Sequence, residues 1–308
     1  MQLEPIFSLS TPSNRRLVPP MPRYARVDEA HLPPMQLTAR DKRILETIHA
    51  YDGLLSDLQI QQLFFSGKSA MQVRLMLLYQ HGYLHRPNRR QRAALPTMIY
   101  WLGDKGAAYV AGLQDVPLDE FSWHKEPRLV QVEHDLAVND VRIAFLKACT
   151  RSSDFTLEEW IPASEFHAHP DKVEFVFANG TKASRFIRPD GFCVVSKGTY
   201  TSRLLLELDR ASEDNPRLVR EKILPGIVYL RSAAYKQRCG YTSGRWLFIT
   251  TSERRLKNMK RTTENAAKGD AKLFYFTTID RITPETLLTE PIWWRGGEMT
   301  PTSLFLKA

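Results

Sequence analysis

The stretch that decides the fold runs from residue 187 to residue 210 and reads IRPDGFCVVSKGTYTSRLLLELDR. It contains two short apolar runs, and both are predicted to form strands. Because side chains alternate along a strand, Glu207 and Asp209 in the second run point to the same face of the sheet. Asp190 lies near the start of the first run. If the two strands are neighbours, three carboxylates meet at one point, and such a cluster requires a divalent metal or a basic partner.

A Pro-Asp dipeptide followed by a strand that ends in an acid resembles the core of the PD-(D/E)xK nuclease superfamily. The resemblance implies a restriction-endonuclease-like fold, with Asp190, Glu207 and Asp209 as catalytic residues. Asp209 occupies the position where that superfamily has a lysine. In some members the lysine has moved to the following helix, which makes Lys222 its candidate replacement. The implied metal is Mg²⁺ or Mn²⁺, bound by the three acids and by Glu133 from the helix that precedes the sheet.

Two of these residues have a second interpretation. Lys222 lies at the edge of an amphipathic helix, where a lysine often extends along apolar surface toward water. Glu133 is also compatible with an ordinary surface carboxylate. The residues alone therefore leave two alternatives open, a metal-dependent phosphodiesterase and a binding protein that retains the acids for structure.

Length and composition limit the classes of protein to consider. With 308 residues the chain is long enough for two domains. No apolar run approaches the roughly 18 residues that cross a membrane, and the first residues lack the pattern of a secretory signal. We therefore expect a cytoplasmic protein without a membrane partner. Cys149, Cys193 and Cys239 are far apart, which argues against a disulfide framework and a zinc site.

Positive charge is concentrated in one region of a chain whose formal net charge is +9. Between residues 231 and 261 Glu253 is the single acid, whereas basic residues stand at nine positions, 231, 236, 238, 245, 254, 255, 257, 260 and 261. Such a density is typical of a surface that faces DNA. The alternative is a solvated helix face. The candidate DNA contacts here are Arg254, Arg255, Lys257, Lys260 and Arg261.

The first 35 residues contain seven prolines, a density that neither a helix nor a central strand tolerates. We expect residues 1–35 to form a flexible, basic arm.

Residues 36–113 show the element order of a winged helix-turn-helix domain. Apolar spacing predicts three helices that start near Thr38, Ser56 and Ser69. A basic segment at 86–92 then separates two apolar segments, which predicts a β-hairpin. In a winged helix the third helix enters the major groove and the hairpin contacts the DNA backbone, although the same fold also serves as a protein-interaction module. The candidate DNA contacts are Arg74, Arg86, Arg89, Arg90 and Arg92.

Residues 114–127 are predicted to form a linker, residues 128–282 an α/β domain with a mixed sheet, and residues 283–308 a carboxy-terminal extension. The second domain is expected to contain a helix over 128–150, strands over 157–161 and 173–177, the two acid-bearing strands, a helix that starts at Asn215 and kinks at Pro225, a strand over 245–250, a basic helix after Ser252 and a strand over 272–277. The predicted fold class is therefore α+β.

Six segments together resemble the replication-relaxation proteins of bacterial plasmids and integrated mobile elements. They are LTARDKRIL at 37–45, QLFF at 62–65, HDLAVNDV at 134–141, RPDG at 188–191, LELDR at 206–210 and TSERR at 251–255. The resemblance implies a DNA-binding protein that acts in the replication, mobilisation or transcriptional control of such an element. Its expected partners are double-stranded DNA and the replication or mobilisation proteins of the element, and a homodimer is left open. The alternative function is a metal-dependent endonuclease that nicks DNA at the Asp190 and Glu207 acids.

Overall fold

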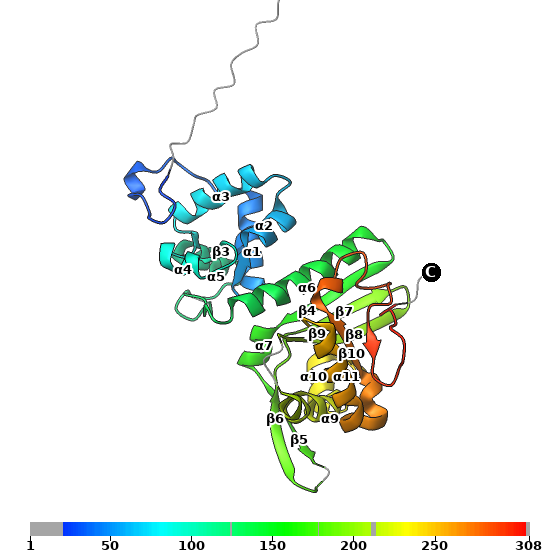
Figure 1. The fold of residues 1–308 in the computed structure, drawn as a ribbon. Coiled ribbons are helices and arrows are strands. Elements are labelled where there is room, and N and C mark those ends of the chain that lie inside the picture. Colours follow the sequence, from blue (N-terminus) through cyan, green and yellow to red (C-terminus); the bar gives the residue numbers. More distant parts are fainter. Residues whose placement is uncertain (1–20, 124, 178, 211–213, 306–308) are drawn as a thin grey trace, which may run out of the picture.

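The computed structural model describes residues 21–123, 125–177, 179–210 and 214–305. The protein is of the α+β class and contains a mixed six-stranded sheet, which confirms the predicted class. Figure 1 shows two groups of elements, one on either side of the long helix α6 (Val132–Arg151). We call residues 39–113 the amino-terminal unit and residues 132–295 the sheet unit. No helix in the described part of the chain is long and apolar enough to cross a membrane.

The amino-terminal unit combines five helices with a small antiparallel sheet in the order β1-β3-β2. Its helices are α1 (Ala39–Ala50), α2 (Asp57–Phe64), α3 (Lys68–Gln80), α4 (Arg89–Ala93) and α5 (Asp104–Leu113), and its strands are β1 (Leu54–Ser56), β2 (Leu84–His85) and β3 (Ile99–Leu102). The predicted caps at Thr38 and Ser56 are confirmed, because each side chain accepts a backbone hydrogen bond three residues ahead. Apolar side chains of α1, α3 and β3 form the core of this unit.

The basic segment between β2 and β3 differs from the simple hairpin predicted there. The two strands do pair, but Asn88 and Gln91 form a capping box that starts the short helix α4. Arg86 is buried and its guanidinium carbon lies 4.1 Å from the centre of the Tyr79 ring. The cluster of basic side chains is therefore divided between the interior and the surface.

Residues 21–36 pack along α3 instead of forming the flexible arm expected over 1–35, of which residues 1–20 lie outside the described part. The buried Gln80 side chain donates hydrogen bonds to the carbonyls of Pro22 (3.1 Å) and Ala25 (3.0 Å). A short 3₁₀ helix, η1 (Glu29–His31), follows. Prolines prevent regular structure here but leave their carbonyls available as acceptors, and Gln80 at the end of α3 donates to one of them.

The large sheet has the strand order β11-β10-β9-β8-β7-β4. Its strands are β4 (Phe155–Pro162), β7 (Gly191–Lys197), β8 (Tyr200–Asp209), β9 (Arg245–Thr250), β10 (Phe274–Thr278) and β11 (Trp294–Arg295). β8, β9 and β10 are parallel to one another, whereas the remaining neighbours are antiparallel. The short 3₁₀ helices η3 (Lys268–Leu273) and η4 (Ile279–Arg281) flank β10.

Both faces of this sheet are buried. α6 covers one face, and α9 (Leu224–Leu230), α10 (Ala233–Cys239) and α11 (Glu253–Ala267) cover the other (Figure 1). The helix predicted from Asn215 is capped by Asp214 instead and consists of α8 (Asn215–Leu218), a π-helical turn η2 (Val219–Ile223) and α9. The π turn ends two residues before Pro225, which has no amide hydrogen for the normal helical bond.

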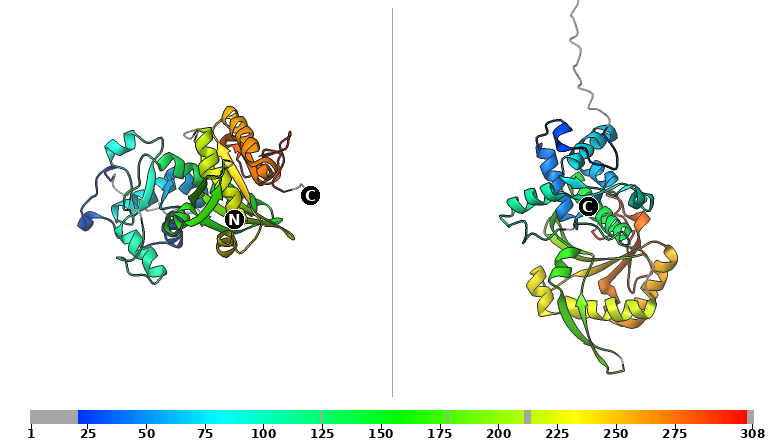
Figure 2. Two further views of the ribbon diagram at one scale, coloured as in Figure 1. Left: turned by 90° about the horizontal axis from the view of Figure 1, so that it is seen from below. Right: turned by 90° about the vertical axis from the view of Figure 1, so that its left-hand side faces the viewer.

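Two elements of the sheet unit depart from the sequence-based expectation. α6 begins at Val132, four residues later than predicted. The strand expected at 173–177 belongs to a separate hairpin, formed by β5 (Asp171–Val176) and β6 (Lys182–Ile187), which follows the short helix α7 (Ala163–Ala168). This hairpin projects from the sheet unit, as Figure 1 and the right-hand view of Figure 2 show.

α6 also joins the two units through buried amide side chains. Asn139, which is 1% exposed, donates to the carbonyls of Leu54 (3.0 Å) and Tyr51 (3.3 Å). From the opposite direction, the Gln59 amide donates to the Leu136 carbonyl and to an Asp140 carboxylate oxygen, both at 2.8 Å. These bonds fix the end of α1 and the start of α2 against one stretch of α6.

Replacing Asn139 by alanine should destabilise the protein. The change leaves the Tyr51 and Leu54 carbonyls without this buried donor, which we expect to lower the free energy of unfolding by about 2 kcal/mol. Urea unfolding followed by tryptophan fluorescence measures the effect. Gln72→Ala, at an exposed position of α3, is the matched control and should leave the midpoint unchanged. Equal midpoints for both variants would contradict the assigned role of Asn139.

Candidate acid site and basic surfaces

Asp190 lies just before β7 and is held by groups from two segments, β8 and α6. Its backbone amide donates to the Leu206 carbonyl at 2.9 Å, and its Oδ2 accepts from the Leu208 amide at 2.6 Å. Its Oδ1 lies 3.0 Å from Nε2 of His134, in the first turn of α6. The carboxylate is therefore fixed at the junction of α6 with strands β7 and β8.

The His134 and Asp190 side chains shift each other's ionisation. Burial acts to lower the pKa of His134, but the hydrogen bond and charge of Asp190 outweigh it and raise this pKa above 6.5. Burial acts to raise the pKa of Asp190, but the hydrogen bond and charge of His134, with a smaller contribution from Lys222, lower it. For the adjacent Asp135, burial raises the pKa to about 6. The charged form of the His134–Asp190 pair is therefore favoured.

Glu207 and Lys222 form the second ion pair of this region. Lys222 lies in the π-helical turn η2, and its Nζ contacts Oε1 of Glu207 on β8, with both side chains largely buried. The charge of Lys222 contributes to the lowered pKa of Asp190, and the charge of Glu207 contributes to the raised pKa of His134. We call these four residues the acid site.

The other two predicted metal ligands lie in separate ion pairs. Asp209 contacts Nε of Arg255 from α11, and Glu133 contacts Arg210. Within the described residues no group of three or more His, Cys, Asp or Glu side chains is close enough to hold a metal ion. The predicted set of four carboxylates is therefore not assembled, because a different segment supplies a cation to each. The common face of Glu207 and Asp209 is confirmed, since both pair with segments that cover one side of the sheet.

The predicted DNA contacts of the amino-terminal unit fall into two groups. Arg74 points to α1, where it pairs with the fully buried Asp41 and donates to the Gln36 carbonyl at 2.9 Å. Arg92 donates to the Leu95 carbonyl. Arg74 and Arg92 thus have structural contacts, as the buried Arg86 does. The exposed members of the set are Arg89 and Arg90.

The exposed face of α3 was missed by the sequence reasoning. Met71, Leu75 and Leu78 are buried, so the helical period directs the intervening positions of the first two turns to solvent. The exposed positions are Lys68, Ser69, Ala70, Gln72 and Val73. The spacing of the apolar residues indicated this face, because the positions between and before them in the helix point outward.

The basic region at 231–261 is partly neutralised by acids, three of them far away in the sequence and one in the same helix. Arg231 pairs with Asp270, Arg238 with Asp171, Arg255 with Asp209, and Lys260 with Glu264. Arg254, Lys257 and Arg261 are exposed and follow the helical period of α11, so they form one stripe. The local charge available to a partner is therefore smaller than the sequence count indicates.

A model of the family described as replication-relaxation matches residues 46–236. This chain belongs to the replication-relaxation family. The matched region starts within α1, ends within α10 and includes parts of both units and all four residues of the acid site, but not α11. Family membership indicates a role in the replication or relaxation of a plasmid or mobile element. No curated protein and no solved structure matches the chain.

His134 is the acid-site residue of this family member that the site predictions omitted. It lies four residues before Val138 and seven before Val141, and both valines are buried against the sheet. The helical period therefore places His134 on the sheet-facing side of α6, directly above the start of β7. That position was readable from the sequence, whereas its pairing with Asp190 required the three-dimensional fold.

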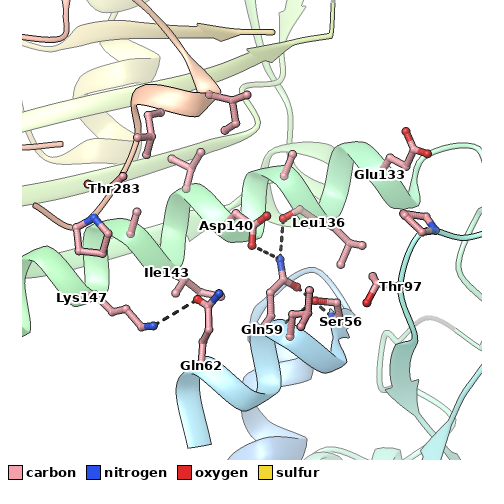
Figure 3. Close-up of a pocket in the computed structure, with 18 of the residues that line it drawn as sticks. Ser56, Gln59, Gln62, Thr97, Glu133, Leu136, Asp140, Ile143, Lys147 and Thr283 are labelled. Carbon is pink, nitrogen blue, oxygen red and sulfur yellow. Dashed lines mark hydrogen bonds between the residues drawn. The ribbon is translucent and has the colours of Figure 1, made fainter. Parts of the chain in front are cut away.

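A groove lies where the two units meet. Figure 3 shows this groove of about 950 Å³ between α2 and α6, with Thr283 on a third side. Its polar contacts join the units, since Gln59 bonds to α6 and Lys147 donates to Gln62 at 3.3 Å. Burial raises the pKa of Asp140 in this groove, although the hydrogen bond from Gln59 acts against the shift. Its side chains mainly attach the amino-terminal unit to α6.

The shifts in the acid site predict a characteristic pH dependence of stability. Because the folded pKa of His134 is raised, its contribution is complete below pH 6.5 and is lost as pH rises through the folded value. Asp135 has a folded pKa of about 6 against 3.8, so stability also falls as pH rises between these values. Urea unfolding in buffer with a metal chelator measures both effects.

Single substitutions distinguish the two pH ranges in which stability falls. His134→Gln should remove the decline above pH 6.5 and retain the one between pH 3.8 and about 6. Asp135→Asn should do the reverse. A His134→Gln variant whose decline above pH 6.5 matches that of the wild type would refute the assignment.

Proposed function

We propose that this protein binds double-stranded DNA of a plasmid or integrated mobile element and acts in its replication or relaxation. One observation carries the proposal. The element order α1-β1-α2-α3-β2-α4-β3, with an antiparallel sheet, supports a winged helix in which the short helix α4 interrupts the β2–β3 pair, and it leaves one face of the first two turns of α3 exposed. In such a domain the third helix enters the major groove with these turns toward the bases.

The exposed residues of α3 have the chemistry that base reading requires. Gln72 offers both a hydrogen-bond acceptor and a donor, which recognition of adenine requires. Val73 offers an apolar contact for a thymine methyl group. Lys68 is suited to guanine or to a phosphate. Arg74 has an indirect role here, since its pair with Asp41 fixes α3 on α1.

Phosphate contacts would come from exposed cations on both units. Arg89 and Arg90 lie in the first turn of α4, beside the β2–β3 pair. The α11 stripe of Arg254, Lys257 and Arg261 adds positive charge without a groove-reading element. Contacts of this kind supply affinity and position but little sequence preference.

Replacing Arg89 and Arg90 together by alanine should weaken duplex binding and lower its salt dependence. Each lost phosphate contact reduces the slope of log K against log salt by about 0.9, so the double variant should lose roughly two. Fluorescence anisotropy over a salt series provides the measurement. Arg151→Ala with Arg281→Ala removes the same charge from exposed ion pairs of the sheet unit and should leave the slope unchanged. Equal slopes for the two double variants would contradict a contact through α4.

The acid site favours a second candidate function, a metal-dependent phosphodiesterase that nicks DNA. Apart from α7 and the β5–β6 hairpin, which lie between β4 and β7 in the chain, the order α6, antiparallel β4-β7-β8, helical segment and parallel β9 supports a comparison with the restriction-endonuclease-like core. Asp190 lies just before β7 and Glu207 lies on the neighbouring strand β8, so the two acids come from adjacent segments of the sheet. A nick in one strand releases superhelical strain, which is a direct route to relaxation.

The carboxylates of Asp190 and Glu207 are of the chemical type that a magnesium ion binds. Mg²⁺ keeps several of its waters and is commonly bound by one or two carboxylates together with substrate phosphates. Asp190 and Glu207 would hold it, and it would stabilise charge on the phosphate and activate a water. His134 orients the Asp190 carboxylate, and Lys222 places a cation beside Glu207.

Nicking of supercoiled plasmid in Mg²⁺ or Mn²⁺ tests this candidate. Asp190→Asn and Glu207→Gln should each abolish nicking while duplex affinity is retained, because neither residue belongs to the proposed duplex-binding surface. Glu133→Gln, which removes an exposed acid outside the acid site, is the matched control and should nick like the wild type. A wild type that binds duplex but nicks in neither metal would overturn the phosphodiesterase and leave the binding function intact.

A further inference from the structure

The projecting β5–β6 hairpin presents an outer face on which two large apolar side chains, Val176 and Phe186, are exposed among polar ones. In its register Lys172 pairs with Phe186 and Val176 with Lys182. These four side chains are exposed, whereas Val173 on the alternate positions is buried. Phe186 is 54% exposed, a large fraction for an aromatic ring on a regular strand.

A small pocket connects the base of this hairpin with the acid site. Its volume is about 180 Å³, and its lining includes Phe186, Arg188, Glu207, Arg217 and Lys222. The guanidinium carbon of Arg188 lies 5.5 Å from the centre of the Phe186 ring. An aromatic face and positive charge therefore meet within one hollow, directly beside a proposed catalytic acid.

We propose that this pocket is a binding site for one nucleotide of single-stranded DNA, with its base stacked on Phe186 and its phosphate bound by Arg188. The inference rests on the proposed DNA-binding function and names a separate contact within it. The pocket is of the size of a single base, and stacking on an aromatic ring is the main sequence-independent way to bind one. Arg188 contributes charge and a planar group at the same place.

The exposed ring selects an unpaired strand over a duplex. Bases within a duplex stack on one another and offer only their edges, so an aromatic ring can stack on a base only where pairing has been lost. Cations also complement this ligand, because Arg188, Arg217 and Lys222 stand around the pocket against Glu207 and Glu221. An acidic protein segment shares the charge complementarity but gains nothing specific from a flat aromatic face.

Binding of a fluorescein-labelled oligothymidine to the full-length protein, followed by anisotropy, tests the proposal. Phe186→Ala should weaken binding about tenfold, the loss expected for one base stacked on an aromatic ring. Phe186→Trp should retain wild-type affinity, because it preserves the stacking face. Arg188→Ala should weaken binding and lower the salt slope by about 0.7, the value for one phosphate of a single strand.

Val176→Ala is the matched control, since Val176 is a 58% exposed apolar residue on the same face of the hairpin. It should bind the oligonucleotide like the wild type. Equal losses for Val176→Ala and Phe186→Ala, or no loss for Phe186→Ala, would overturn the nucleotide site and favour a protein partner for this face.

Duplex binding separates this proposal from the function on which it rests. Phe186→Ala should bind duplex DNA with unchanged affinity, because α3 and α4 supply that contact. If the wild type binds duplex and Phe186→Ala binds the oligonucleotide as tightly as the wild type does, the nucleotide site alone is refuted. A wild type that binds neither kind of DNA would refute both.

Discussion

The position of α6 between the two units is the constraint on which the rest of the structure depends. One side of this helix packs on the large sheet through apolar residues, and the other carries Asn139, whose amide satisfies two carbonyls of the amino-terminal unit. Buried carbonyls without a donor are costly, so the end of α1 cannot move away from α6 without a penalty. His134 lies on the same helix, little more than one turn from Asn139. The position of the amino-terminal unit and the geometry of Asp190 therefore depend on one rigid element.

Charge balance around β8 explains why the acids are tolerated in a buried sheet. Asp190 faces His134 from α6, Glu207 faces Lys222 from the π turn, and Asp209 faces Arg255 from α11. Isolated carboxylates at these positions would be destabilising, whereas paired ones are compatible with burial. The folded chain consequently does not require a metal for neutrality. A metal or a DNA phosphate entering the acid site would act on pairs that are already formed, with Lys222 and His134 as the groups that respond.

Local sequence patterns predicted the elements better than they predicted the contacts. The caps at Thr38 and Ser56 and the strand at 245–250 were readable because each depends on residues within a few positions. The alternation of apolar and polar residues along β5 also predicted a strand. It does not determine that this strand pairs only with β6 and lies outside the large sheet. At Asn88 the capping box was present in the sequence, and the density of arginines obscured it.

In the candidate site, too, features that depend on nearby residues were predictable, whereas contacts between residues far apart in the sequence were not. The common face of Glu207 and Asp209 follows from strand geometry alone, and Lys222 was a reasonable partner from its place in the next helix. The pair of Asp209 with Arg255 joins residues 46 positions apart. The Asp41–Arg74 pair likewise joins two helices, so its effect on the exposure of Arg74 could not be read from either helix.

These pairings change what the net positive charge can do. Many cations of the sheet unit are held by acids, so affinity for a polyanion must come from the few groups that remain exposed. Those groups are of two physical kinds. The polar face of α3 suits the edges of paired bases, whereas the Phe186 and Arg188 surface suits an unpaired base and its phosphate. Under the proposed function, one surface would therefore bind the duplex and the other the opened strand. α6 joins the units that carry these two surfaces and contributes His134 to the acid site, whereas Glu207 and Lys222 extend that site to the base of the hairpin, where the opened strand would lie.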